Sequence, residues 1–212
     1  MQPRAELKRT PSTMANPAEE TRFEIQRHRI LRAAATCFNQ KGFSGTSLKD
    51  VARHLGLTDA ALYYYVKSKE ELVYQCYLRA ADLGREAMER ARCEGRTGFE
   101  QATLYLRYHV EIMVGERGPV AIMSEIPSLQ KPHRDQILGV SRQHSLEFEK
   151  ILMTGIEDGS IACDDVRMTG NAIMGAINWI PKWFHGDAKT SRAVIAEFPV
   201  ILGRSLRNSL PD

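Results

Sequence analysis

The spacing of apolar positions along the chain predicts helices throughout. From about Phe23, apolar residues recur every three to four positions as far as Phe38, and Gly42 follows as a stop. Positions 48, 51, 52 and 55 then form the single apolar stripe of a short second helix. No stretch alternates with the period of two that is typical of a half-buried strand. The predicted fold class is therefore all-α.

Capping residues set the ends of the next helices. Ser47 followed by Asp50 is a capping-box pattern at the start of the second helix. Thr58, after a break at Gly56, is placed to cap a third helix, and Ser68 to cap a long fourth one. The expected ranges of these three helices are 47–54, 59–65 and 68–92.

The remainder of the chain has the same periodicity, interrupted at glycines and prolines. The expected helices are 99–115, 118–127, 131–157, 165–184 and 190–207. Pro181 and Pro199 fall inside the last two of these, where each should cause a kink or an early end.

The N-terminal stretch differs from everything after it. Residues 1–21 are rich in Pro, Ser, Thr, Ala and Glu and lack periodic apolar positions, so we expect a disordered arm. Two short helices before a long one suggest a small helical domain over 22–70. The larger remainder, 71–212, forms a second helical domain in this interpretation.

Composition excludes several classes of protein. A hydrophobic content of 43% over 212 residues supplies a sizeable core. No apolar run approaches the roughly 20 residues that span a bilayer, and the N-terminus lacks the apolar region of a secretory signal. The cysteines and histidines are scattered without metal-ligand spacing. We expect a cytoplasmic protein with free thiols, no membrane partner, no metal and no cofactor.

Charge is unevenly distributed along the chain. The formal net charge is +3, yet residues 22–67 alone carry eight basic and three acidic side chains. Residues 1–21 are neutral, so the body after residue 67 is slightly acidic. A basic N-terminal block favours a polyanionic partner for that block, although a solvated basic surface would give the same composition.

Residues 46–71 contain the most informative motif. Two short helices joined by a glycine-bearing turn, the first amphipathic and the second polar and aromatic, form a helix-turn-helix pattern. In such motifs the second helix enters the major groove of DNA with its N-terminal end toward the base edges. That helix has one good core anchor, Leu62, followed by three tyrosines about 100° apart, so at least one tyrosine must face outward.

These residues resemble the TetR family of bacterial transcriptional regulators. The resemblance rests on Gly56, Thr58, the run 62–65 (Leu-Tyr-Tyr-Tyr) and the run 67–70 (Lys-Ser-Lys-Glu), and it extends over about 23–75. It implies a homodimer that binds a pseudo-palindromic operator in double-stranded DNA. It also implies a ligand-binding and dimerisation domain that releases the operator when a small effector binds.

The resemblance assigns roles in DNA contact to particular positions. It places near phosphates Thr46, Ser47, Tyr63, Tyr65 and Lys69, and near bases Lys49, Ala61 and Tyr64. Thr58, the cap of the recognition helix, belongs to the same DNA-binding set. Each has an ordinary alternative, since tyrosines can pack between helices and Lys69 can be a solvated lysine. Asp59 departs from the family pattern and would repel phosphates unless it accepts from a cytosine amino group. Ala60 and Ala61 replace larger side chains and leave few groups for base readout, so we expect modest sequence specificity.

The C-terminal domain supplies two further sets of candidates. Apolar and polar side chains that could line an effector cavity are Tyr105, His109, Met113, Met123, Ile126, Phe148, Leu152 and Trp179. For any single one, ordinary core packing is the alternative. Residues expected at the dimer interface, where the last helices are apolar on more than one face, are Ile173, Ile177, Ile180, Trp183, Phe198, Ile201 and Leu202.

A shorter resemblance concerns the effector. Residues 175–184 are similar to a segment of TetR-type regulators of fatty-acid, sterol and aromatic-acid breakdown, whose effectors are often acyl-CoA thioesters. A CoA ligand would need cations for its phosphates, and Arg107, Arg134 and Arg142 are candidates. Either a repressor or an activator is compatible with these patterns, as is a DNA-binding protein without an effector. The sequence has no catalytic motif, which argues against an enzyme.

Overall fold

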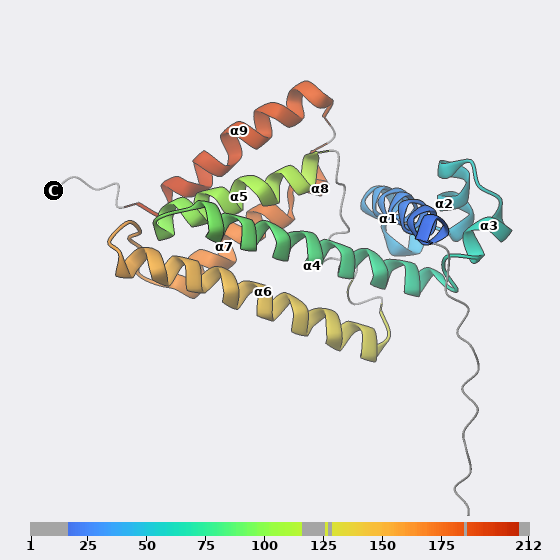
Figure 1. Cartoon of the computed structure of the whole chain (residues 1–212), viewed down its shortest axis with the longest axis horizontal. Coiled ribbons are helices and arrows are strands. Elements are labelled where there is room, and N and C mark those ends of the chain that lie inside the picture. The colour runs from blue at the N-terminus through green and yellow to red at the C-terminus, as the bar shows by residue number, and fades with distance from the viewer. Residues whose placement is uncertain (1–16, 116–125, 127–128, 185, 208–212) are drawn as a thin grey trace, which may run out of the picture.

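A computed structural model describes residues 17–115, 126, 129–184 and 186–207, and within them every regular element is helical. The helices are α1 (Pro17–Gly45), α2 (Leu48–Leu55), α3 (Asp59–Tyr63), α4 (Lys69–Glu94), α5 (Gly98–Val114), α6 (Lys131–Glu157), α7 (Val166–Asn178), α8 (Ile180–Trp183) and α9 (Ala188–Arg204). Figure 1 shows α1, α2 and α3 gathered at one end of an elongated molecule, with α4 running from that end into the remaining helices. The predicted all-α class is confirmed.

The N-terminal helices share one core with the first turns of α4. Ile30, Phe38, Val51 and Leu62 are buried in it from α1, α2 and α3. The same core takes in residues 72, 73, 76 and 77 of α4 and residues 126, 129 and 137. The domain boundary that we placed at residue 70 therefore falls at the start of a continuous helix whose first two turns belong to both parts.

The C-terminal helices pack around α5, which contacts α4, α6, α7, α8 and α9. Tyr105 and Leu106 of α5, Phe148 of α6 and Ile177 of α7 are fully buried in this second core. Because these side chains are packed on several sides, they fix the helices that surround the cavity described below.

Several helix bounds differ from those expected. The first helix begins at Pro17 rather than near Phe23, so residues 17–21 are helical and only 1–16 of the expected arm lie outside the described residues. Gly42 does interrupt the helical backbone, with φ 71° and ψ 174°, which a residue with a side chain rarely adopts. The expected helix over 118–127 lies almost entirely outside the described residues.

The two prolines behave differently. The expected helix over 165–184 is two helices, because α7 ends at Asn178 and Pro181 lies in the first turn of the short α8. In contrast, α9 continues through Pro199 to Arg204, so of the kink or early end expected there the early end does not occur. The range 131–157 is found as predicted, with Pro132 in the first turn where a missing N–H costs nothing.

None of the helices in the described part of the chain has an apolar stretch long enough to cross a bilayer.

Candidate DNA-binding surface and effector cavity

The helix-turn-helix is held by the caps that the sequence indicates. The Ser47 hydroxyl accepts from the N–H of Asp50 at 3.2 Å, and the Asp50 carboxylate accepts from the N–H of Ser47 at 2.9 Å, so the capping box is complete. The Ser47 hydroxyl also donates to the Asp50 carboxylate at 2.6 Å, and this bond, together with the one from the Ser47 N–H, holds the pKa of Asp50 below its usual range. Thr58 caps α3 by accepting from the N–H of Ala61 at 3.2 Å. The short α3 is therefore fixed at its N-terminal end, the end that faces bases in this motif.

The three tyrosines after Leu62 point in different directions. Tyr63 and Tyr64 are exposed, by 56% and 74%, whereas Leu62 is buried. Tyr65 is half-buried, and its ring stacks on that of Phe23 with centroids 4.9 Å apart. Two tyrosines are thus presented to a partner, and Tyr65 mainly joins α3 to α1.

A shallow depression lies beside the start of α2. It is lined by Ser47, Lys49 and Tyr63, by Lys67 before α4 and Lys69 at the start of α4, and by neighbouring residues of the α1–α2 turn. Lys49 is exposed, and its side chain forms no hydrogen bond or ion pair with the described residues. Three lysines around one depression suit a phosphate group, and they offset the negative charge of Asp50 at the same place.

Two of the residues predicted to contact phosphates form hydrogen bonds within the protein. The Thr46 side chain is only 2% exposed, and its hydroxyl donates to the carbonyls of Cys37 and Gly42 at 3.1 and 2.9 Å. Its hydroxyl therefore secures the end of α1, which corrects the role in DNA contact that we predicted for it. The ammonium group of Lys69 donates to the carbonyl of Phe43 at 2.9 Å, and it lies 4.1 Å from the centre of the Phe43 ring.

Lys69→Met should therefore affect stability as well as DNA binding. The variant loses a charged hydrogen bond and a cation–π contact, so urea unfolding should show a loss of about 1–2 kcal/mol. Lys49→Met, in contrast, should leave the free energy of unfolding unchanged. Both variants should flatten the salt dependence of DNA affinity. If the unfolding midpoint of Lys69→Met were unchanged, the contact between Lys69 and Phe43 would not contribute to the free energy of unfolding.

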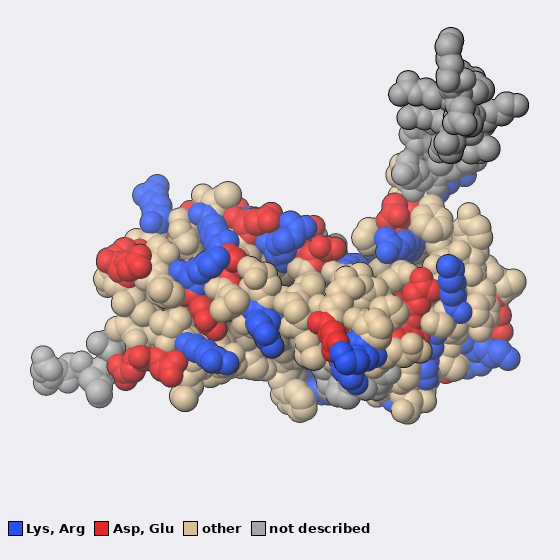
Figure 2. Space-filling model, turned by 90° about the horizontal axis from the view of Figure 1, so that it is seen from below, with Lys and Arg blue, Asp and Glu red and all other residues tan. Residues whose placement is uncertain are grey.

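Surface charge is mixed over much of the molecule. On the face shown in Figure 2, Lys and Arg are interspersed with Asp and Glu along the whole length. The basic block in the sequence therefore does not produce a single-sign field on that face. The lysines of the depression beside α2 are a more local feature than the composition suggested.

The C-terminal domain has a partly open cavity of about 160 Å³ between α4, α5, α6 and α7. Its lining is mainly apolar, and two histidines, His109 and His144, provide polar groups. The hydroxyl of Tyr105 lies 2.6 Å from Nδ1 of His109 and 2.6 Å from Nε2 of His144. The residues that line the cavity are Tyr77, Ala80, Ala81, Gly84, His109, Ile112, Met113, Ile137, Val140, Ser141, His144, Ser145, Met174 and Asn178.

Only some of the predicted effector residues lie at the cavity. His109 and Met113 line the cavity, and Tyr105 lies behind them. Phe148 and Leu152 are fully buried in the core, and Ile126 is buried in the N-terminal core, so these three do not line it. Trp179 is 60% exposed and also lies elsewhere, while Met123 is outside the described residues. The contribution of α4 was missed, because Ala80, Ala81 and Gly84 are too small to indicate a ligand site from sequence.

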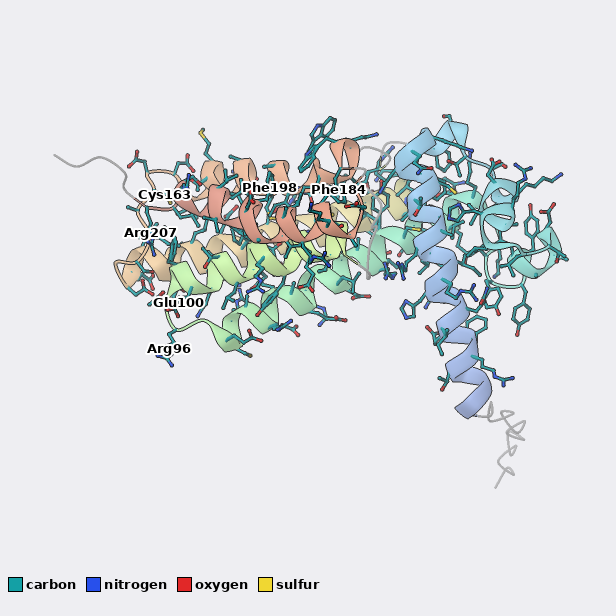
Figure 3. The ribbon with its side chains drawn as sticks, turned by 90° about the horizontal axis from the view of Figure 1, so that it is seen from above. Arg96, Glu100, Cys163, Phe184, Phe198 and Arg207 are labelled. Atoms are coloured by element: carbon teal, nitrogen blue, oxygen red, sulfur yellow. The ribbon has the colours of Figure 1, made fainter. Side chains whose placement is uncertain are left out.

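The residues predicted at the dimer interface also differ in their exposure. Ile173, Ile177 and Ile180 are buried within the subunit, which excludes them from an interface. Trp183 and Ile201 are exposed, and Phe198 and Leu202 are half-buried. Figure 3 shows Phe198 close to Phe184 along the C-terminal helices, and the ring of Trp183 lies 5.8 Å and 6.2 Å from their rings.

One stripe of α7 is exposed along its whole length. Met168, Ala172, Gly175 and Trp179 are spaced by four, three and four residues, so they lie on one side of the helix, and all four are exposed. A side chain at Gly175 would meet nothing within 4 Å. An apolar stripe with small residues at its centre allows another helix to approach closely.

The cavity and the DNA-binding helices share structural elements. Tyr77 and Ile137 line the cavity and are also buried in the N-terminal core. In the first turn of α4, Glu70 accepts from the N–H of Gln130 at 3.0 Å and pairs with Nδ1 of His133 at 2.9 Å. These hydrogen bonds hold the pKa of Glu70 below its usual range. Because α4 and α6 contribute side chains to both the cavity and the N-terminal core, a displacement of either helix at the cavity changes the packing against α1, α2 and α3.

A helix-turn-helix with an exposed recognition helix, joined by one long helix to a domain with a cavity, defines a ligand-responsive DNA-binding regulator. Comparison with known families agrees. The model for bacterial regulatory proteins of the tetR family matches residues 30–76, and the model for the tetracyclin repressor-like C-terminal domain matches 95–202. The chain belongs to the TetR family of transcriptional regulators, as the motif at residues 46–71 predicted.

Individual relatives support the assignment. The fatty acid metabolism regulator protein of Bacillus subtilis is 25% identical over 164 residues, which are 76% of this chain and 84% of the relative. The crystal structure of PfmR from Thermus thermophilus is 31% identical and superposes with a TM-score of 0.70, over 85% of this chain and all of that one. AibR in complex with isovaleryl coenzyme A and operator DNA has the same fold, with 23% identity and a TM-score of 0.67 over 85% and 98% of the chains.

Proposed function

We propose that the protein is a homodimeric repressor that binds a pseudo-palindromic operator and leaves it when an acyl-CoA enters the C-terminal domain. The observation that carries this proposal is the connection between the two ends of the molecule. An exposed recognition helix lies at one end, a partly open cavity lies in the other part, and α4 contributes to the packing of both.

At the DNA surface, the exposed side chains divide into two groups. Lys49, Tyr63 and Lys67 surround the depression beside α2, and Ser47 and Lys69 complete its wall, so we assign this group to one phosphate-contacting surface. Tyr64, with Ala61 and the capped N-terminus of α3, is assigned to the base edges. Tyr65 contributes by fixing α3 against α1.

The dimer forms, in this proposal, through the exposed apolar side chains of α7 and α8 and through the side of α9 that presents Ile201. The stripe on α7 continues to Trp179 and Trp183, and Ile201 extends the apolar surface onto α9. Large apolar residues at this exposure need covering, and a symmetric pairing of two copies provides it. Two recognition helices then lie on one side of the duplex, about 34 Å apart, which is one turn of DNA.

The proposed effector class is supported by two similar proteins and by the size of the cavity. One relative is named as a fatty acid metabolism regulator, and a protein with the same fold is described with isovaleryl coenzyme A. A cavity of about 160 Å³ is smaller than a typical drug-sized pocket, so it suits a short acyl group with the CoA portion outside.

The CoA phosphates need cations near the mouth of the cavity. Arg134 lies on the same face of α6 as Ile137, about one turn before it, and is our candidate. Arg107 lines a groove between α5 and α9 instead, on the opposite side of α5 from His109 and Met113. We therefore withdraw Arg107 as a phosphate ligand.

The proposal is tested by measuring both equilibria on one protein. Operator fragments are first selected from a random duplex library, and their affinity is measured with increasing isovaleryl-CoA and longer acyl-CoAs. One acyl-CoA should weaken operator binding at least tenfold. Calorimetry should then show that saturating operator weakens the binding of that acyl-CoA by the same factor, because coupling between two sites is reciprocal. Operator affinity that no acyl-CoA alters would refute the effector class.

A further inference from the structure

Three polar side chains form a chain of hydrogen bonds at the inner end of the cavity. The Tyr105 hydroxyl lies between His109 and His144, 2.6 Å from one ring nitrogen of each. The remaining nitrogens, Nε2 of His109 and Nδ1 of His144, have no hydrogen-bond partner in the described part of the chain. Neither nitrogen is a fully buried polar atom that lacks a hydrogen bond, and both rings line the cavity. These two nitrogens are therefore available to a ligand.

The Tyr105 hydroxyl has one proton and also lies 3.5 Å from Sδ of Met174. A thioether is a much weaker acceptor than an imidazole nitrogen, so the hydroxyl donates to one histidine and accepts an N–H from the other. If Nδ1 of His109 carries its proton, the hydroxyl donates to Nε2 of His144, and His144 is protonated on Nδ1. If the order is reversed, both rings are protonated on Nε2. In either order the two neutral histidines have the same tautomer, and the cavity receives one N–H donor and one bare nitrogen.

The described part of the cavity offers no opposite charge to an ionised ligand group. Its polar lining side chains in that part of the chain are uncharged, and no Lys, Arg, Asp or Glu is among the described lining residues. Burial lowers the pKa of His109 to about 3 and also lowers that of His144, so both rings stay neutral near pH 7. An unpaired carboxylate in such a site would lose its hydration without gaining an opposite charge.

The position of His144 is set by a glycine on the facing helix. A Cβ atom built on Gly84 of α4 would lie 3.0 Å from Cε1 of the His144 ring and 3.3 Å from Nε2. The imidazole thus fits against the backbone of α4, where a side chain would have to push it away from Tyr105. This close approach holds the ring in line for the Tyr105 hydroxyl.

From this geometry we propose that the cavity selects an uncharged carbonyl compound, such as a thioester, ester or amide, through one imidazole N–H of the Tyr105–His109–His144 chain, and that it rejects the corresponding free carboxylate. The proposal rests on the proposed function and specifies which acyl derivatives act as effectors. A regulator with this selectivity responds to the activated acyl group and ignores the free acid.

The first test uses the unmodified protein and a series with one carbon skeleton. Isovalerate, methyl isovalerate, isovaleramide and isovaleryl-CoA are titrated into the full chain by calorimetry at pH 7, without DNA. The ester and the amide should bind at least tenfold more tightly than the carboxylate. Isovalerate that binds as tightly as its ester would overturn the proposal.

The second test examines the tautomers directly. Nitrogen NMR of the histidine rings should show His109 and His144 in the same tautomer, either both Nδ1–H or both Nε2–H. Tyr105→Phe should remove this agreement and weaken ester binding about tenfold. Tyr108→Phe is the matched control, because it removes a hydroxyl from the same helix whose partner is Glu94, outside the cavity lining. Opposite tautomers in the wild-type protein would overturn the proposal without any variant.

The two proposals fail in different ways. If acyl-CoAs release the operator but free carboxylates do so equally well, the selectivity for an uncharged carbonyl is wrong and the function stands. If the ester binds selectively in calorimetry but no acyl-CoA alters operator affinity, the cavity is selective and its regulatory role is wrong.

Discussion

Ile201→Glu should abolish high-affinity operator binding without unfolding the subunit. Ile201 is 55% exposed on α9, so its replacement removes little packing within the subunit. In a symmetric interface the variant places two carboxylates on surfaces that face each other, and the dimer should dissociate. Operator affinity should then fall about 10³-fold, toward the level of non-specific binding. Sedimentation and operator titration measure the two effects on the same sample.

Val200→Glu is the matched control for this substitution. The two residues are neighbours on α9 and equally exposed, but about 100° apart around the helix. Val200 lines the groove between α5 and α9 together with Arg204 and Arg207, where a new carboxylate meets positive charge. Val200→Glu should remain dimeric and bind operator normally. If it dissociates as readily as Ile201→Glu, the interface lies on a different face of α9.

The DNA-binding half could be predicted from sequence because its determinants are local. Caps at Ser47, Thr58 and Ser68 all form as the sequence indicates. Such contacts join residues three positions apart, so spacing alone specifies them. The internal roles of Thr46 and Lys69 were missed, because their partners lie at the end of α1, which a capping pattern does not locate.

The ligand and dimer surfaces could be predicted less well, because both depend on which face of a helix is covered. Apolar residues occupy more than one face of α7, and periodicity does not say which face meets the subunit core. The structure buries Ile173 and Ile177, which we had assigned to the interface, and exposes Trp179, which we had assigned to the cavity. Similarly, the chain of Tyr105, His109 and His144 joins α5 to α6 across 39 residues, a relation that no local pattern contains.

The second large effect is expected at the recognition helix itself. Tyr64 is 74% exposed, and the contacts that its ring makes are edge-on contacts with Phe23 and Tyr65, with ring centroids 5.9 and 5.1 Å away. Tyr64→Ala should therefore leave the fold intact. Each half-site should lose a base contact of about 1–2 kcal/mol. The two losses add in the dimer, so operator affinity should fall about 10²-fold. Affinity for random duplex DNA should change little.

Tyr63→Ala separates base contact from phosphate contact, since Tyr63 lines the depression beside α2 with Lys49. It should weaken operator and random DNA by similar factors, whereas Tyr64→Ala should weaken the operator alone. The difference follows from the helix itself, because neighbouring side chains point about 100° apart and only one of them can face the groove floor. Equal losses on both DNAs for Tyr64→Ala would place its hydroxyl on the phosphate backbone. The sequence preference would then have to come from Ala61 or from DNA shape.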